Sequence, residues 1–387
     1  MANKKSLPIL MLVMFLVMVG FGIIIPVMPF FAEEVGASPM QLGLLMASYS
    51  VMQFLFAPMW GRISDRIGRK PVMLIGIAGL SLSFFLFAFS DTLTMMFVSR
   101  ILAGFLSSAN MPTVMAYVAD ITTPENRGKG MGMIGASVGM GFIFGPAIGG
   151  IFSRESYSTP FLIAGVVAAI TFVFVLLVVK ESLAKENRKT KGEANESRWK
   201  AFGGSLSYLY MLSLITTFSL AALEATFAYF AAERAGLDTV HLGYIFMIMG
   251  VAGAFVQGGM VGRLIKKFGE GGTLQIGLIV SAIGFGLVLL TNSFWTAALY
   301  LSVFGMGNSL IRPCVSAIIS KRTTVGQGAA TGLLSSFESL GRVAGPPIGG
   351  AIYAVQMSSP YLTGLVATVV ALVLYRMYVS KVPGKAV

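Results

Sequence analysis

Long apolar stretches recur along the whole chain and constrain its fold more than any other feature. Each is about 20 residues or longer, which is what an α-helix needs to cross a hydrocarbon core of about 30 Å. Membrane-spanning strands would alternate apolar and polar residues instead, so we expect helices. The twelve predicted spans lie near 7–32, 40–60, 71–90, 93–119, 129–153, 160–180, 204–232, 240–261, 272–291, 294–319, 327–355 and 359–379.

Charged residues are scarce. They make up 11% of the 387 residues, against 56% hydrophobic residues, whereas a soluble domain carries about 25% charged residues. These few charged residues are too few for the surface of a water-soluble protein. The chain is therefore predicted to be an all-α integral membrane protein. The 46 glycines fit this interpretation, because glycine lets helices in a membrane approach closely.

Lysine and arginine lie almost entirely in alternate loops. With the N-terminus placed inside, the predicted outer loops hold only Arg154 and Arg234, and all other loop lysines and arginines fall in inner segments. This bias predicts that both termini are cytoplasmic, and it makes the net charge of +12 a topology signal rather than a sign of nucleic-acid binding. The apolar run after Lys4 and Lys5 lacks a small-residue cleavage site, so we expect an uncleaved first helix rather than a signal peptide.

One polar stretch divides the spans into six and six. We therefore predict an N-terminal six-helix bundle at 1–180, a cytoplasmic linker at 181–203 and a C-terminal six-helix bundle at 204–387. The halves also repeat, since Met59-Trp-Gly-Arg-Ile63 matches Met260-Val-Gly-Arg-Leu264 at an offset of 201. Each repeat has an even number of helices, so both run in the same sense and the substrate site is expected between them near the midplane.

A second repeat contains five glycines and a proline. At an offset of 200 residues, Gly132, Gly141, Gly145, Pro146, Gly149 and Gly150 match Gly332, Gly341, Gly345, Pro346, Gly349 and Gly350. Gly141, Gly145 and Gly149 are four residues apart on one helix face, so they predict close approach of another helix. Pro146 removes a backbone hydrogen bond and is expected to bend its helix. We expect this stretch to serve structure and gating rather than substrate chemistry.

The chain resembles the major facilitator superfamily, and within it the twelve-helix drug:proton antiporters. Gly61-Arg-Ile-Ser-Asp65-Arg66-Ile-Gly68-Arg69-Lys70 fits the loop 2–3 signature, and the glycines and proline from Gly132 to Gly150 fit the helix-5 antiporter motif. Pro26-Val-Met-Pro29 and Arg100 with Gly104 are similar to two further motifs, with Ala103 where glutamine is common. The resemblance covers the whole chain and is strongest to quinolone and multidrug exporters of Gram-positive bacteria. It implies the major facilitator fold, with twelve helices in two pseudo-symmetric bundles.

The loop 2–3 residues are predicted to form a gate. Gly61 and Gly68 are expected to permit a tight turn with positive φ, and Pro71 suits the first turn of the next helix. The resemblance implies a latch in which Asp65 faces the helix start near Gly326-Gln-Gly328, where free N–H groups favour an anion. The gating set is Gly61, Asp65, Arg66, Gly68, Arg69, Asp120, Arg127 and Arg342, with Asp120 expected to pair with Arg69 or Arg127. The alternative is that these are solvated charges that fix orientation.

Five charged residues fall inside predicted spans: Arg100, Glu224, Arg312, Glu338 and Arg342. Because each costs energy in a bilayer, such residues are functional by default. Glu224 has no basic residue one helical turn away, and apolar surroundings disfavour a charged carboxyl, so we expect it to exchange protons or bind cations; the alternative is an arginine partner from another helix. Arg100 is expected to position a water or a carboxylate on the proton path.

Glu338 and Arg342 are four residues apart, so they are expected to form a structural or gating pair, with a second proton site at Glu338 as the alternative. Arg312 precedes Pro313 as in the resembled exporters, but Ser309 stands where those carry an acid. Any second acidic coupling site has therefore moved, with Glu338 as the candidate. The proton-coupling and substrate set is Glu224, Glu338, Arg100 and Arg312.

A substrate cavity with flexible and aromatic walls suits promiscuous apolar binding. The candidate lining residues are Met52, Gln53, Phe54, Asn110, Phe227, Phe304 and Phe337, and the alternative for most is helix packing or contact with lipid. His241 is expected at a surface and Cys314 in packing.

No nucleotide motif, metal cluster or nucleophile with a nearby histidine occurs in the sequence, so an enzyme is disfavoured and no cofactor is expected. Without a P-loop the energy must come from an ion gradient. We predict a proton-coupled antiporter of the bacterial cytoplasmic membrane that exports lipophilic, often cationic drugs by alternating access, as a monomer among lipids. The alternatives are a flippase for lipids or lipid-linked glycans, another metabolite exporter of this fold, or a tetracycline-type exporter; the last is disfavoured because predicted helices 1 and 3 carry no acid.

Overall fold

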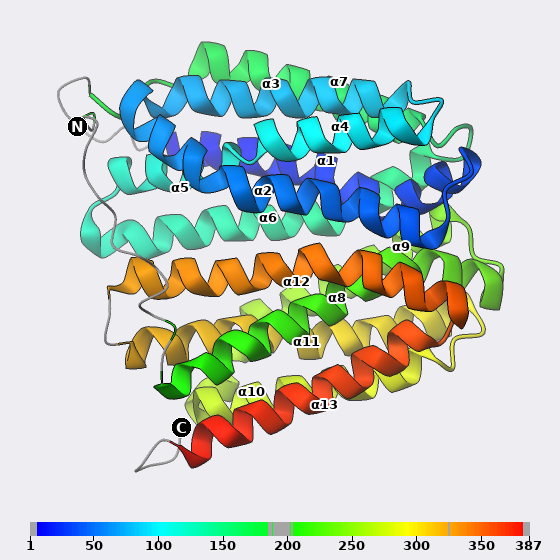
Figure 1. Cartoon of the computed structure of the whole chain (residues 1–387). Helices are drawn as coiled ribbons and strands as arrows, with labels where there is room; N and C mark the ends of the chain where they lie inside the picture. The colour runs from blue at the N-terminus through cyan, green and yellow to red at the C-terminus, as the bar shows by residue number, and fades with distance from the viewer. Residues whose placement is uncertain (1–5, 185–187, 189–201, 203, 324–325, 382–387) are drawn as a thin grey trace. The chain divides into compact units, whose positions relative to one another are not determined.

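The computed structural model describes residues 6–184, 188, 202, 204–323 and 326–381. Every regular element in these ranges is helical (Figure 1). The first half contains α1 (Ser6–Glu34), α2 (Pro39–Ile67), α3 (Arg69–Ala88), α4 (Leu93–Ser107), α5 (Asn110–Ile121), α6 (Pro124–Phe152) and α7 (Thr159–Val178). The second half contains a 3₁₀ turn (Gly204–Leu206), α8 (Ser207–Ala235), α9 (Thr239–Phe255), a π-helical turn (Val256–Met260), α10 (Val261–Val288), α11 (Phe294–Arg322), α12 (Gln327–Val355) and α13 (Ser359–Ser380).

Ten segments of the described chain are long and apolar enough to cross a membrane. One of them, Thr239–Val288, is 50 residues long, which is about 75 Å of helix and far more than one crossing needs. Its backbone leaves helical geometry at Gly269, with φ 71° and ψ 172°, and so divides it into two. A further 29-residue helix, α12, carries Glu338 and Arg342 and is not among the ten. The protein is thus a multi-pass membrane protein, and the number twelve stays a prediction.

The two sharp turns at Gly68 and Gly269 reproduce the sequence repeat in the backbone. Gly68 has φ 111° and Gly269 has φ 71°, a region that residues with a Cβ rarely enter. In both halves the helix before the turn runs past the predicted end of the apolar span. Polar residues such as Arg62 and Arg263 therefore lie on extended helix rather than in loops.

The predicted fourth span is two helices, because α4 ends at Ser107 and α5 begins at Asn110. Ser108 bonds back to the carbonyl of Phe105 at 2.8 Å. Pro112 has no N–H to bond the carbonyl four residues earlier, which accounts for the interrupted ladder.

The chain divides into two compact units, Met1–Ala37 with Ser48–Ala194 and Ser38–Ala47 with Asn195–Val387. Within the first, α1 packs along α6, and α3 packs against α7 and α4. Within the second, α8 packs along α12 and α13, and α10 packs along α11 (Figure 1). The predicted boundaries at 180 and 204 stay predictions.

Glycines of the predicted helix-5 motif lie at the contact between α1 and α6. A Cβ on Gly145 would lie 2.6 Å from Cα of Gly22, and one on Gly149 would lie 2.5 Å from the carbonyl oxygen of Ile23. Real Cβ atoms do not approach so closely, so these positions require glycine. The predicted close approach of a second helix is confirmed.

The same arrangement recurs 200 residues later, between α8 and α12. A Cβ on Gly345 would lie 2.6 Å from the carbonyl oxygen of Phe218, and one on Gly349 would lie 2.8 Å from Cβ of Ala222. Thus α6 packs against α1 in the first unit, and α12 packs against α8 in the second. By contrast, Gly132 and Gly332 have no such neighbour within 4 Å.

Candidate functional site

The turn between α2 and α3 is built around Gly68. Helix α2 ends at Ile67 and α3 begins at Arg69, so Gly68 alone makes the reversal. Gly61 lies inside α2 and has no positive φ, so the prediction that it shares in the turn is wrong. The reason is that α2 continues past the apolar span for two more turns. Pro71 lies in the first turn of α3, as expected.

Arg69 is held between two carboxylates from different helices. Its Nη1 lies 2.5 Å from Oδ1 of Asp65, and its Nε lies 3.1 Å from Oδ2 of Asp120. Nη1 also donates to the hydroxyl of Ser64 at 2.7 Å. The arginine side chain is 8% exposed, so a cation that would be costly to bury is neutralised where it lies. The predicted pairing of Asp120 with Arg69 is confirmed.

The remaining basic residues of the predicted gate lie apart from this cluster. Arg66 is exposed in the last turn of α2, and within the described ranges Arg127 donates to the carbonyl of Ala119, at 3.4 Å. The predicted contact of Asp65 with the start of the helix near 326–328 stays a prediction.

Sequence reasoning missed two residues of this cluster, Glu181 and Ser182, which follow α7. The carboxylate of Glu181 accepts the backbone N–H groups of Arg69 at 2.8 Å and of Lys70 at 3.1 Å. The hydroxyl of Ser182 donates to Oδ2 of Asp120 at 2.8 Å. These contacts join residues more than 60 positions apart, and no local pattern in the sequence indicates them.

Arg100 lies in the interior of the first unit, on α4. It is 8% exposed, its Nε has no hydrogen-bond partner among the described residues, and its guanidinium lies 4.7 Å from the centre of the Tyr49 ring. This is cation–π geometry, which partly offsets the cost of burying the charge. Arg100 lacks an acidic partner in the described part of the chain.

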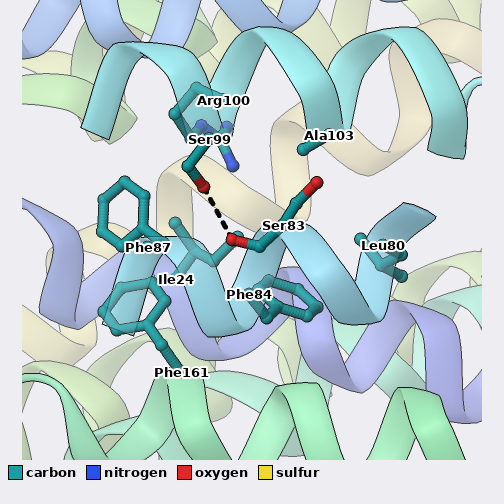
Figure 2. Close-up of a pocket in the computed structure, with 9 residues that line it drawn as sticks. All are labelled: Ile24, Leu80, Ser83, Phe84, Phe87, Ser99, Arg100, Ala103 and Phe161. Atoms are coloured by element: carbon teal, nitrogen blue, oxygen red, sulfur yellow. Dashed lines mark hydrogen bonds between the residues drawn. The ribbon is translucent and has the colours of Figure 1, made fainter. Parts of the chain in front are cut away.

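Arg100 lines a small cavity between α1, α3, α4 and α7, which Figure 2 shows. Its polar wall consists of Arg100, Ser83 and Ser99, and the hydroxyl of Ser99 donates to the carbonyl of Ser83 at 2.6 Å. The other walls are the apolar residues Ile24, Leu80, Phe84, Phe87, Ala103 and Phe161. There is room for about one water molecule, so this is a site for a water or a small ion rather than for a drug.

Four predicted cavity residues lie in the first unit. Met52 and Phe54 are half-buried on α2, and Gln53 donates to the hydroxyl of Tyr49 at 3.4 Å. Asn110 is 2% exposed, and neither side-chain polar atom has a partner among the described residues. Asn110 is therefore an unsatisfied buried amide, which in a membrane interior is a candidate for binding water or a polar group of a substrate.

The three predicted aromatic cavity residues of the second unit lie in its packed core. Phe227 is 0% exposed, Phe304 2% and Phe337 5%. Phe227 meets Phe246, Phe304 meets Phe285, and Phe337 stacks on Phe202 at 5.3 Å. Burial on all sides makes them core residues, which corrects the expectation that they face an open cavity.

Glu224 lies midway along α8 and is partly buried between the fully buried Leu223 and Ala225. No ion pair among the described residues includes it. The charge of Arg342 on α12 acts on it, and Arg342 itself forms no described ion pair. Glu224 is therefore a partly buried carboxyl on a membrane-spanning helix, without an ion pair among the described residues.

Glu338 is paired with Arg312, and not with Arg342. The Nε of Arg312 on α11 donates to Oε1 of Glu338 on α12 at 2.9 Å. The partner expected four residues away, Arg342, is exposed and forms no ion pair with Glu338 in the described part of the chain. A long side chain from the adjacent helix thus takes the place of the one on the same helix.

His241 is at the surface as predicted, half-exposed and bonded to Asp238, and Cys314 is buried. Among the described residues, no group of three or more His, Cys, Asp or Glu is placed to hold a metal ion.

Comparison with known proteins places this geometry in context. The family model described as Major Facilitator Superfamily matches residues 10–274 and 258–387. The chain is 32% identical over 385 residues to Multidrug resistance protein 2 of Bacillus subtilis, which covers 98% of this chain and 96% of that protein. It is 28% identical to the Quinolone resistance protein NorA of Staphylococcus aureus, with 92% of each chain covered.

Solved transporter structures share the fold. The nucleoside transporter NupG matches with a TM-score of 0.80 at 14% identity and covers 98% of this chain and 99% of that one. A bacterial homologue of the human lysosomal transporter Spinster matches with a TM-score of 0.79 at 13% identity and covers 98% of this chain and 97% of that one. At these identities the likeness concerns the fold alone.

Proposed function

Because this chain belongs to the major facilitator superfamily, we propose that it is a proton-coupled multidrug exporter of the bacterial cytoplasmic membrane. It is a transporter, not an enzyme, and the relatives named as multidrug and quinolone resistance proteins span nearly its whole length. The export of lipophilic, often cationic compounds follows from those names together with the charged groups of the membrane interior.

The observation that carries the proposal is the placement of Glu224. A partly buried carboxyl on a membrane-spanning helix, without an ion pair among the described residues, is a candidate for gaining and losing a proton during transport. In its charged form it attracts a cation, and in its neutral form it does not. One group therefore links the binding of a cationic drug to the release of a proton.

The other charged residues of the predicted spans and gate also have roles in the proposed transport cycle. In our account the two units rock against each other, and the Asp65–Arg69–Asp120 cluster closes the cytoplasmic side. Arg100, which has no described acidic partner, attracts an anionic group or orders a water on the proton path. The Arg312–Glu338 pair joins α11 to α12 and keeps these helices together during the movement.

The energy of the cycle comes from the proton gradient. Exchange of one proton for one monovalent cation moves no net charge, so the driving force is the pH difference across the membrane, and one pH unit supports about a tenfold concentration ratio of the drug at about 1.4 kcal/mol per decade. A proton that enters from outside neutralises Glu224, the drug leaves, and the protonated carrier returns. We expect the protein to act as a monomer, with both termini in the cytoplasm.

Transport in proteoliposomes tests this function. Ethidium serves as the cation, a tetracycline and a fluorescent lipid run in parallel, and a protonophore collapses the imposed pH gradient. We expect gradient-dependent ethidium transport that the protonophore abolishes. Movement of the lipid alone would replace the proposal with a flippase, and movement of tetracycline alone would replace it with a specific exporter.

A further inference from the structure

Helix α3 begins without a capping residue of its own. Its N-cap position is Gly68, which has no side chain, and no local side chain bonds the first N–H groups. The free N–H groups at a helix start require partners, which an N-cap side chain normally provides. Here the carboxylate of Glu181 bonds the N–H groups of Arg69 and Lys70, from more than 100 residues away.

The geometry of Gly68 is adapted to this remote cap. A Cβ at Gly68 would lie 2.9 Å from the carboxyl carbon of Glu181. Gly68 is therefore needed both for its positive φ and for the space that the carboxylate occupies. Glu181 also accepts the N–H of Leu183 at 3.0 Å, which fixes the carboxylate in place.

A second contact runs in the opposite direction between α3 and α7. The Nζ of Lys70 donates to the carbonyl of Leu176, in the last turn of α7, at 2.8 Å. An anion thus lies at the start of α3 and a cation at the end of α7, and both complement the helix dipoles. Contacts of Glu181 with the start of α3 and of Lys70 with the end of α7 thus hold the two helix ends together.

The same stretch of chain is bonded to α5. Tyr117 donates to the carbonyl of Lys180 at 2.6 Å, and Ser182 donates to Asp120 at 2.8 Å. Oδ2 of Asp120 is also the atom that meets Arg69. We call Lys180–Leu183 the linker anchor, because it is where the predicted linker leaves α7.

We propose that Glu181 is a positioning residue of the gate: through the linker anchor it fixes the α2–α3 turn and so holds Arg69 between Asp65 and Asp120. Glu181 acts through the backbone N–H groups that begin α3. This role rests on the proposed gating function of the cluster. It adds to that function a residue outside the loop 2–3 signature.

The direct test is amide hydrogen exchange in the full chain. Glu181→Ala removes the acceptor, so exchange at Arg69 and Lys70 is expected to rise at least about tenfold, with a smaller rise for Glu181→Asp. Glu155→Gln is the matched control, because this exposed carboxylate has no described hydrogen bond. In this variant, exchange at Arg69 and Lys70 is expected to match wild type. Wild-type exchange in Glu181→Ala overturns the proposal.

The functional test separates rate from binding. In proteoliposomes, Glu181→Ala is expected to lower the initial rate of ethidium transport at least about threefold, and to leave ethidium affinity within about twofold of wild type. A purely structural role would lower folded yield and affinity as well. Faster exchange with an unchanged transport rate would overturn the positioning role.

A double mutant distinguishes capping from general damage. Gly68→Ala introduces strain and pushes the carboxylate away, so alone it is expected to lower the transport rate at least as much as Glu181→Ala does. Together the two changes are expected to be less than additive, since they disturb one contact, and additive losses would contradict the account. If wild type moves no test compound, the proposed function fails, while amide exchange, which needs no cargo, still decides the role of Glu181 in fixing the turn.

Discussion

Nε of Arg312 and Oε1 of Glu338 lie 2.9 Å apart and join α11 to α12. The carboxylate is mostly buried, with 15% of its side chain exposed, whereas the arginine is 74% exposed. Glu338 is therefore a paired acid, in contrast to Glu224. The two carboxyls of the membrane interior are thus not equivalent.

This pairing predicts the effect of exchanging the two charges. Arg312→Glu and Glu338→Arg are each expected to lower the melting temperature, because each leaves like charges side by side. The double mutant restores the pair, so we expect recovery of most of the loss and a coupling free energy above about 0.5 kcal/mol. Additive losses would show that the pair contributes nothing.

Contact between α1 and α6 predicts a difference between two glycines of one motif. A Cβ at Gly145 meets Cα of Gly22 at 2.6 Å, and the backbone must shift to make room. We expect Gly145→Ala to cost about 1–3 kcal/mol of stability, measured as a lowered melting temperature. Gly132→Ala is the matched control: among the described residues, no atom of another helix would lie within 4 Å of the added Cβ, and the melting temperature is expected at or above wild type. Equal losses at both positions would contradict the packing account.

Arg100 is predicted to serve function at the expense of stability. The cation is buried without a described acidic partner, and replacing such a group by an apolar one of similar volume is often neutral or stabilising. Arg100→Met is therefore expected to keep or raise the melting temperature while abolishing ethidium transport. If transport survives, Arg100 has no role on the proton path. If stability and transport are lost together, its role is structural.

A surface pair predicts a pH dependence. Burial of Asp238 opposes its charged form, but hydrogen bonds from the backbone and ring of His241 outweigh this and hold the pKa of the aspartate below its usual value. A lowered pKa in the folded state stabilises the protein above the unfolded pKa of about 3.9. The stabilisation begins to fade as pH falls below that value, and it is lost as pH falls through the lower pKa of the folded state. We expect wild type to melt slightly above Asp238→Ala at pH 7 and the difference to shrink towards pH 3.5; a difference that grows on acidification would contradict this.

The fold was largely predictable, because both of its signals are local. Apolar length defines the helices, and the repeated glycines predict where another helix packs closely, as the contacts of Gly145 and Gly345 illustrate. The turn at Gly68 was predictable for the same reason. The predicted end of α2 was wrong, because the helix continues beyond its apolar span and includes Gly61.

The site was predictable only in part. Spacing in the sequence shows that Glu338 and Arg342 share a helix face, but not that Arg312 of a neighbouring helix lies closer. Equally, no spacing relates Glu181 to Arg69, because that contact depends on how α7 ends beside α3. The abundance of phenylalanine led to the prediction that Phe227 lines a cavity, whereas the structure buries its side chain in the core. Tertiary contacts of this kind cannot be predicted from the spacing of residues in one sequence.

The central claim is that one carboxyl, Glu224, exchanges a drug cation for a proton. Proton release from the purified protein in weakly buffered detergent solution, recorded as ethidium is added, tests it most directly. We predict that wild type releases protons as it binds ethidium and that Glu224→Gln releases none, while Glu338→Gln behaves like wild type. Undiminished proton release from Glu224→Gln would contradict the account.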